Sequence, residues 1–457
     1  EWLQTTTTHV METTGKNYAK LMQIFSLIPN SMQYEPNDQI GIPWDLNKIA
    51  QLLFFIALSA TVVCLICART KAKRWWIGGL GLLLSAVLLT GYFIPVSVPV
   101  MDLSAASETA DTTYYDMIHK DCQKDEAADF RVKKYQLDFS VGLNLTGSAK
   151  VYVDRSELKS YRFTLYHGYK VKQVTDQTGA ALDFRREYDY VTVTRGGAAV
   201  EYLCLEYTGK SPKYYSSYAG VCLPANFAYY PIPGYRELFK DNFYGFIDCS
   251  LPYDTAFDVR CSGRKQMYCN LAARGDNHFA GNARSITLLS GYYDTLKLND
   301  TLVVYPKYAD TEIQAKIKKN MGTFTKEHRD IRTIFIMGAD NLTPYEHLRS
   351  YDGYLVTSSI YDMEQSYFES QIDISKLHFY KTFVYYYNEK VDREELEQLK
   401  QSEDPEEYPM VQIILKLSAS KNREAAAAET EQYLTNSKDT RAPMTFLQEL
   451  GEKYAKA

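Results

Sequence analysis

The histidines are the residues of this chain best suited to bind a metal ion, and their spacing decides whether they can do so locally. The sequence has seven of them: His9, His119, His167, His278, His328, His347 and His378. A zinc site on one helix needs two imidazoles at i and i+4 and a glutamate that acts as base toward the bound water. The two nearest histidines here are 19 residues apart. The sequence therefore predicts no local two-histidine zinc site and assigns no catalytic, cofactor-binding or metal-binding residue and no cofactor. Zinc held by distant His, Asp and Glu residues stays open.

Carboxylates and thiols offer two further kinds of chemistry. Glu346 and Glu369, or the acidic run 394–397, have the residue types of a glycosidase carboxylate pair, but a solvated helix face explains the run more simply. Six cysteines follow the apolar segments: Cys122, Cys204, Cys222, Cys249, Cys261 and Cys269. An even number permits up to three disulfides, with reduced buried thiols as the alternative. Cys261 and Cys269 close the shortest loop and are the pair we predict. None of the six forms a C-x-x-C pair, which disfavours a zinc ribbon.

The composition excludes several classes of protein. The chain has 457 residues, of which 23% are charged and 46% hydrophobic, and its formal net charge is -5. It is too apolar for intrinsic disorder and too balanced in charge for a nucleic-acid binder. It has no G-x-x-x-x-G-K-[ST] segment, so it has no phosphate-binding P-loop of its own. Tyrosine is unusually frequent, with 39 residues, which favours β-structure.

Two long uncharged segments predict a membrane-anchored protein. Residues 49–68 and 75–101 are each long enough to cross a hydrocarbon core of ~30 Å as a helix. Between them, 69–74 contains four basic residues, and the positive-inside rule places this loop in the cytoplasm. We therefore expect 1–48 to be exoplasmic and 102–457 to be extracellular at the cell membrane. We also expect the chain to be the C-terminal piece of a longer polytopic protein.

The extracellular part is predicted to have two folded domains after a stalk. Residues 102–126 are polar and aperiodic, as in a linker. Residues 127–305 form short alternating runs separated by glycines, which indicates an antiparallel β domain. Its clearest run places six apolar residues on one face and ends at Gly147: Tyr135, Leu137, Phe139, Val141, Leu143 and Leu145. Residues 306–457 indicate a mixed, mostly α domain. One of its helix faces is predicted at Ile313, Ile317 and Met321.

The order of these parts resembles aminopeptidase N-like gluzincin metallopeptidases. The resemblance is carried by the strand series from Tyr135, by AYYPIPGY at 228–235 and by ARSITLLSGYYDTLKL from Ala283. Two spans followed by such a domain look like a bacterial ABC-transporter permease fused to an aminopeptidase-like ectodomain. The resemblance covers residues 100 to about 380.

The chain departs from this family at the metal motif, because it has no H-E-x-x-H. If YEHLR marks the motif, Glu346 keeps the place of the base but Tyr345 and Arg349 stand where the two imidazoles should be. If the motif is placed at His378 instead, one ligand remains but Phe379 replaces the base. Neither placement supports zinc catalysis, so the family's peptidase activity does not carry over.

The resemblance implies the C-terminal part of an ABC permease with a catalytically inactive, peptidase-like extracellular domain. Its expected partners are a separate ABC ATPase subunit, the lipid bilayer and an extracellular peptide or envelope ligand, and no nucleic acid. The alternative is a membrane-tethered zinc aminopeptidase with non-standard ligands.

Overall fold

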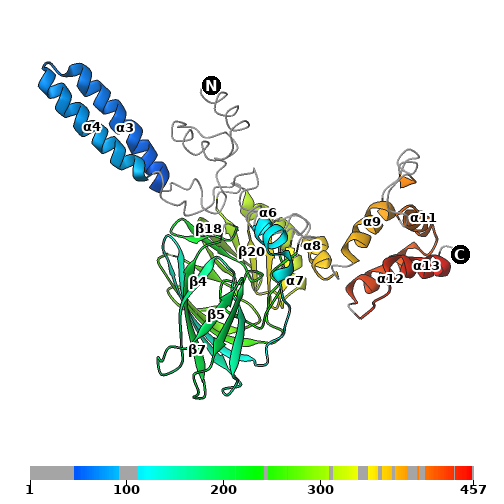
Figure 1. The fold of residues 1–457 in the computed structure, drawn as a ribbon. Coiled ribbons are helices and arrows are strands. Elements are labelled where there is room, and N and C mark those ends of the chain that lie inside the picture. The colour runs from blue at the N-terminus through cyan, green and yellow to red at the C-terminus, as the bar shows by residue number, and fades with distance from the viewer. Residues whose placement is uncertain are drawn as a thin grey trace. The chain divides into compact units, whose positions relative to one another are not determined.

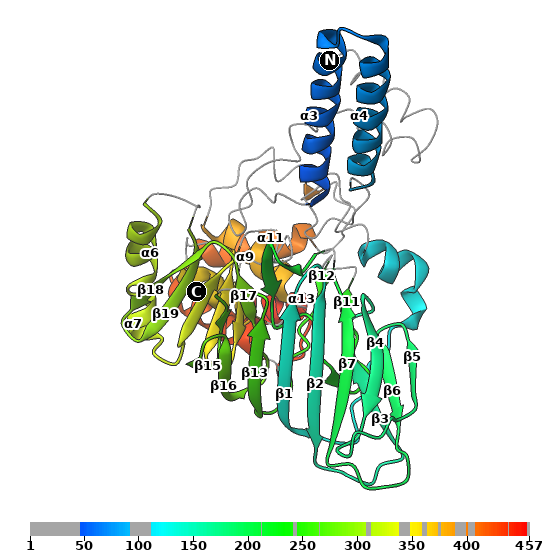
Figure 2. The same ribbon diagram turned by 90° about the vertical axis from the view of Figure 1, so that its left-hand side faces the viewer.

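The chain divides into two compact units, which the computed structural model describes over most of their length (Figures 1 and 2). The first unit comprises 1–347 and 351–360, and the second comprises 348–350 and 361–457. The expected exoplasmic segment 1–48 lies almost wholly outside the described residues. These are 46–91, 111–211, 213–240, 245–264, 266–307, 312–337, 348–358, 363–372, 376–388, 399–400, 407–436 and 438–454.

Two long apolar helices form a hairpin near the start of the first unit (Figure 2). α3 (Leu46–Cys67) has 22 residues and α4 (Lys71–Gly91) has 21. At 1.5 Å per residue, each reaches roughly 30 Å, the thickness of a hydrocarbon core. Large apolar side chains on both helices, such as Ile66 and Leu80, are exposed. By length and composition, both helices could cross a membrane.

The connection between the helices is shorter than the sequence predicts. α4 begins at Lys71, so Lys71, Lys73 and Arg74 belong to its first turn and not to a loop over 69–74. The expected second span started only at residue 75, and its last part, 92–101, lies outside the described residues. The helices meet closely at Gly81, where a Cβ atom would lie 2.2 Å from Thr61 Oγ1. Glycine is therefore required at this crossing.

A seven-stranded sheet forms one layer of the β domain (Figure 2). Neighbouring strands follow the order β15 (Ala272–Gly275), β16 (His278–Ala283), β13 (Thr255–Ser262), β1 (Val132–Val141), β2 (Leu145–Val153), β7 (Tyr202–Gly209) and β4 (Tyr169–Thr175). β1 runs parallel to β13, in the register Leu137 to Val259, and the other pairs are antiparallel. The sheet is thus mixed, which corrects the prediction of a purely antiparallel domain.

The alternating run from Tyr135 belongs to two strands. Tyr135, Leu137 and Phe139 are buried in β1 as predicted, but Leu143 lies in the turn before β2 and is half exposed. Gly147 is no strand breaker. It lies within β2, opposite Tyr207. A Cβ atom at this position would approach the Tyr207 ring to 2.5 Å, so the strand pair needs glycine here.

Three smaller sheets share a hydrophobic core with the seven-stranded sheet. The largest has the order β10 (Ile232–Pro233), β3 (Ser160–Thr164), β6 (Tyr190–Thr194) and β5 (Phe184–Glu187). Another has the order β14 (Tyr268–Cys269), β17 (Leu288–Ser290), β9 (Gly220–Leu223) and β8 (Ser216–Ser217). A short pair joins β11 (Phe239–Lys240) to β12 (Gly245–Phe246). One hydrophobic core includes residues from these sheets and the seven-stranded sheet.

A five-stranded sheet continues beyond the predicted domain boundary at 305. Its order is β18 (Tyr293–Leu298), β19 (Thr301–Pro306), β20 (Thr333–Ile336), β22 (Tyr354–Thr357) and β21 (Leu348–Tyr351). β19, β20 and β22 are parallel neighbours. The helices α6 (Ile313–Met321) and α7 (Phe324–Glu327) connect β19 to β20, and the predicted face of α6 is buried as expected. Residue 305 therefore lies inside a sheet of the first unit.

The second unit is helical over most of its described residues. Its helices are α8 (Met363–Ser370), α9 (Leu377–Asn388), α11 (Glu407–Ser418), α12 (Arg423–Thr435) and α13 (Pro443–Tyr454) (Figure 1). Their core has Val411, Ile414 and Leu417 at its centre. The rings of Tyr433 and Phe446 stack with centroids 3.9 Å apart. This arrangement agrees with the predicted mostly α character of the C-terminal part.

Candidate functional site

The histidine side chains that the structure describes come from separate elements and turns of the fold. Among the described residues, no group of three His, Cys, Asp or Glu side chains is placed to hold a metal ion. His278 Nε2 lies 2.9 Å from Asp258 Oδ1 on neighbouring strands, and His328 packs its ring against Phe324. His9 and His347 lie outside the described residues, as does the side chain of His378. Among the histidine side chains that the structure describes, only His167 lies between two carboxylates.

The two placements of the zinc motif fall partly outside the described residues. Tyr345 and Glu346 are not described, so the first placement is untested. In the second, Phe379 lies on α9 and is 2% exposed, with its ring near those of Phe383, Tyr433 and Phe446. The residue in the place of the base is therefore part of a hydrophobic core.

Residues 111–122 are part of the β domain, which corrects the predicted stalk over 102–126. They form the π-helical turn η2 (Thr113–Ile118) and the short helix η3 (Lys120–Cys122). Asp111 is 2% exposed and Tyr115 is 1% exposed. The Tyr115 ring stacks on Phe239 with centroids 5.0 Å apart. Burial of this kind is incompatible with a free linker.

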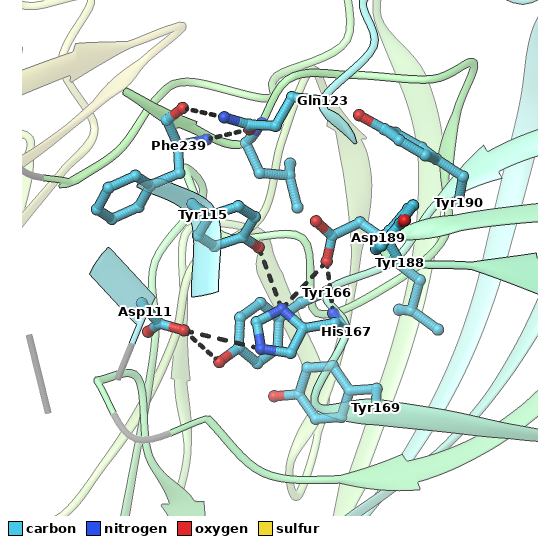
Figure 3. A network of polar contacts seen from close by, with 12 residues as sticks. Asp111, Tyr115, Gln123, Tyr166, His167, Tyr169, Tyr188, Asp189, Tyr190 and Phe239 are labelled. Atoms are coloured by element: carbon cyan, nitrogen blue, oxygen red, sulfur yellow. Dashed lines mark hydrogen bonds and ion pairs between the residues drawn. The ribbon is translucent and has the colours of Figure 1, made fainter. Parts of the chain in front are cut away.

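Strand register brings a buried polar cluster together against this segment (Figure 3). In the β3–β6 pair, Thr164 lies opposite Tyr190. The residues that follow β3 therefore meet the turn that precedes β6, and Leu165 N donates to Asp189 O at 2.8 Å. We call Asp111, Tyr166, His167, Arg186 and Asp189 the Asp–His cluster.

The two carboxylates lie on either side of the His167 ring (Figure 3). Asp189 Oδ1 lies 3.4 Å from Nδ1, and Asp111 Oδ1 lies 4.0 Å from Nε2. Asp189 Oδ1 also accepts a hydrogen bond from the His167 backbone N–H at 2.6 Å. The Tyr115 hydroxyl lies 3.3 Å from Nδ1. An imidazolium at this position would pair with both carboxylates, whereas a neutral ring could donate a hydrogen bond to only one of them.

Burial increases the proton affinity of the Asp111 carboxyl. Loss of solvent raises the pKa of its carboxyl from 3.8 to about 6, and the hydrogen bond from Tyr166 and the charge of His167 oppose this rise. Tyr166 OH donates to Oδ1 at 2.6 Å. The other oxygen, Oδ2, is buried and has no hydrogen-bond partner among the described residues. The carboxyl therefore takes up a proton more readily than an exposed aspartate does.

Arg186 connects the same loops through hydrogen bonds to four backbone carbonyl groups. Nη2 donates to the backbone oxygens of Leu165 and Tyr166, both at 2.9 Å, and Nε donates to Tyr188 O at 3.1 Å. Nη1 donates to Tyr169 O. Burial lowers the pKa of the guanidinium, and the charge of Asp189 opposes that effect. The guanidinium has enough N–H donors, in a planar fork, to bond all four carbonyl groups at once.

A row of aromatic rings in contact runs from His167 to the exposed Tyr188. Tyr114 stacks on His167 with centroids 3.5 Å apart, His119 lies 4.4 Å from Tyr114, and Tyr188 lies 4.6 Å from His119. Tyr188 is exposed and His119 is partly exposed. Tyr188 has φ 54°, a conformation that a bulky side chain rarely adopts. The turn that carries Asp189 is therefore held in a strained backbone conformation.

This arrangement holds residues 111–118 against the β domain around a buried carboxyl whose pKa is raised. Sequence reasoning noted His167 only as one of seven histidines and placed Asp111 in a linker. The available signal was the aromatic pair Tyr114–Tyr115 within that polar stretch, because adjacent large rings rarely stay in solvent.

The predicted Cys261–Cys269 disulfide is absent from the structure. The two residues lie on β13 and β14, which belong to different sheets. Burial raises the pKa of the Cys269 thiol to about 12 and also raises that of Cys261. Both behave as inert core thiols, the alternative that the sequence left open.

No protein-family model and no curated protein sequence matches this chain. Several solved structures match it weakly. They include yeast LTA4 hydrolase in complex with bestatin (10% identity, 73% of this chain and 67% of that chain, TM-score 0.41) and native leukotriene A4 hydrolase from Saccharomyces cerevisiae (11%, 76% and 69%, TM-score 0.39). A third is a mutant M1 zinc metallopeptidase from Deinococcus radiodurans bound to a Tyr-Ser-Ala substrate (12%, 67% and 76%, TM-score 0.34). These are enzymes of the class that the sequence resembles. Every TM-score given is below 0.5, too low to transfer a fold or an activity to this chain.

Proposed function

We propose that this chain is the C-terminal part of an ABC-transporter permease whose extracellular domain binds a peptide or envelope ligand without hydrolysing it. The observation that carries the proposal is the hairpin of α3 and α4. Two helices of membrane-spanning length expose apolar side chains, and a turn rich in cations joins them. Such a pair is stable with its surface in lipid. The basic turn then faces the cytoplasm, and residues 102–457 are extracellular.

A transport role accounts for what the sequence lacks as well as for the hairpin. The chain has no P-loop, and a permease relies on a separate ATPase for nucleotide hydrolysis. It has no H-E-x-x-H, and Phe379 occupies hydrophobic core at one of the two placements of that motif. A peptidase-like domain without its metal motif would retain a surface for peptides but no means to activate water.

The proposal predicts that the full-length parent protein co-purifies with an ABC ATPase. Removing residues 102–457 is expected to change transport or tolerance to peptide antibiotics while leaving the permease–ATPase complex assembled, because the ATPase binds on the cytoplasmic side. Pull-down of the ATPase provides the control for assembly of the truncated protein. A parent that purifies without any ATPase, or a truncation without effect on transport, contradicts the proposal.

The alternative, a tethered zinc aminopeptidase, makes a different prediction. If our proposal is correct, the detergent-purified chain holds much less than one equivalent of zinc and shows no chelator-sensitive hydrolysis of aminoacyl reporter substrates. Metal analysis and a fluorogenic assay measure both. One equivalent of zinc, with activity that Glu346→Gln abolishes and Glu424→Gln preserves, would establish the alternative. Glu424 is a suitable control because it is an exposed carboxylate on α12.

A further inference from the structure

The turn between α3 and α4 concentrates positive charge without any negative charge nearby. Arg69, Lys71, Lys73 and Arg74 are all exposed. The whole hairpin, residues 46–91, contains no aspartate or glutamate. Among the described residues, none of the four cations forms an ion pair with a carboxylate. We call residues 68–74 the basic turn.

Hydrogen bonds give the basic turn a defined shape. Thr70 Oγ1 accepts a hydrogen bond from Lys73 N at 3.3 Å, and Thr70 O accepts one from Arg74 N at 3.1 Å, so Thr70 caps the start of α4. Arg74 Nε donates to Ala68 O at 3.0 Å, which ties α4 back to the end of α3. The cations are therefore presented from a closed turn and not from a flexible loop, which lowers the entropy cost of binding a partner.

Two tryptophans mark the depth at which the basic turn would lie in a bilayer. Trp75 and Trp76 follow Arg74 directly and are 83% and 81% exposed, more than any other large hydrophobic residue described. Indole rings favour the boundary between headgroups and acyl chains. With the tryptophans at that boundary, the cations one turn earlier reach the level of the lipid phosphates.

We propose that the basic turn binds the phosphate headgroups of anionic phospholipids in the leaflet that it faces. The inference rests on the membrane insertion of the proposed function and adds a lipid partner to it. Charge complementarity selects acidic lipid, because four cations without a neighbouring carboxylate meet phosphates that carry net negative charge. A soluble acidic partner would explain the cations but not the two exposed indoles beside them.

Fluorescence quenching in vesicles tests this proposal on the full chain. Trp2→Phe and Trp44→Phe leave Trp75 and Trp76 as the only indoles, since the chain has four tryptophans. Vesicles contain 20% phosphatidylglycerol in phosphatidylcholine, and either the acidic or the neutral lipid carries bromine. We expect quenching by brominated phosphatidylglycerol to exceed that by an equal amount of brominated phosphatidylcholine, which reports local enrichment of acidic lipid.

Substitutions then assign the enrichment to the basic turn. Each cation removed is expected to lower the affinity for acidic lipid about fivefold, the equivalent of about 1 kcal/mol per charge near the surface. Lys71→Gln with Lys73→Gln should abolish most of the enrichment, and Lys71→Arg with Lys73→Arg should preserve it. Lys48→Gln, at the opposite end of the hairpin, is the matched control and should have no effect.

The outcomes separate this proposal from the one on which it rests. A chain that fails to stay with the vesicles after alkaline washing contradicts membrane insertion itself. A chain that stays, but shows equal quenching by both lipids, overturns lipid binding and leaves insertion standing. Loss of ATPase co-purification in the double glutamine variant, without any enrichment of acidic lipid, would assign the basic turn to a protein surface instead.

Discussion

The Asp111→Asn variant is expected to gain stability relative to the wild type as the pH rises. Between pH 3 and pH 8, the difference in the free energy of unfolding between variant and wild type should shift by about 3 kcal/mol in favour of the variant. The carboxyl pKa is about 6 in the folded protein against 3.8 ordinarily, so the folded state binds this proton more tightly than the unfolded state. The resulting stability is fully present below about pH 3.8 and is lost as the pH rises through about 6. Asparagine cannot ionise, and its oxygen still accepts the hydrogen bond from Tyr166. The wild type therefore falls behind the variant as the pH rises.

Amide hydrogen exchange is the suitable measurement, because the chain's four tryptophans all precede the β domain. The His119 N–H, which donates to Tyr114 O at 2.9 Å, reports opening of the segment next to Asp111. Asp176→Asn is the control. Hydrogen bonds from Thr178 lower the pKa of the exposed Asp176, so this variant should lose stability relative to wild type as the pH rises. A difference between Asp111→Asn and wild type that does not change with pH would show that Asp111 is not buried as an acid.

The contrast between Asp111 and the strands shows what the sequence can predict here. The β1 face, with Tyr135, Leu137 and Phe139, follows from alternation because a strand with one buried face repeats every two residues. Asp111 lies in a short polar turn without any period. Its burial depends on Tyr166, which follows β3 and lies more than 50 residues away in the sequence. No local pattern encodes such a contact.

The tyrosines show a similar division. Their abundance predicted β-structure, but it did not predict that many lie in the core with the hydroxyl group bonded to the backbone. Tyr135 OH donates to Pro231 O, Tyr207 OH to Tyr229 O and Tyr229 OH to Ile286 O, each at 2.8–2.9 Å. These bonds satisfy the carbonyl groups of irregular segments that no strand partner reaches. Phenylalanine would fill the same space but leave those carbonyls unpaired, which is a property of the assembled fold and not of the composition.

The sequence also did not predict that some strands pair in parallel. β1 and β13 are separated by more than 110 residues and lie side by side in a parallel register. β19 and β20 are joined through α6 and α7, as a parallel pair requires a crossover. The sequence predicted α6 correctly and yet set a domain boundary at 305, because a change from strands to helices looks the same whether the helices start a new domain or connect two strands of one sheet.

Arg186→Ala is expected to lower the free energy of unfolding of the β domain by about 3–5 kcal/mol, the larger of the two point-substitution effects. The alanine removes donors from four backbone carbonyl groups at once: those of Leu165, Tyr166, Tyr169 and Tyr188. It also leaves the buried Asp189 without a cationic neighbour. Arg186→Lys should recover only part of the loss, because an ammonium group cannot reach all four acceptors in the planes that a guanidinium fork serves.

Arg185→Ala, at the preceding residue of β5, provides the matched control. The Arg185 side chain is 77% exposed and pairs only with the partly exposed Glu187 among the described residues, so we expect a change within about 0.5 kcal/mol. Urea unfolding followed by circular dichroism measures all three variants. Arg186 donates to the backbone oxygen of Tyr166, and Asp111 accepts from the Tyr166 hydroxyl. The Arg186→Ala variant should therefore also lose the pH dependence at Asp111, because its carboxyl returns to solvent and to an ordinary pKa once the cluster opens. Equal effects of the two alanine substitutions would mean that Arg186 is a surface residue and that the backbone alone holds the turns of the Asp–His cluster.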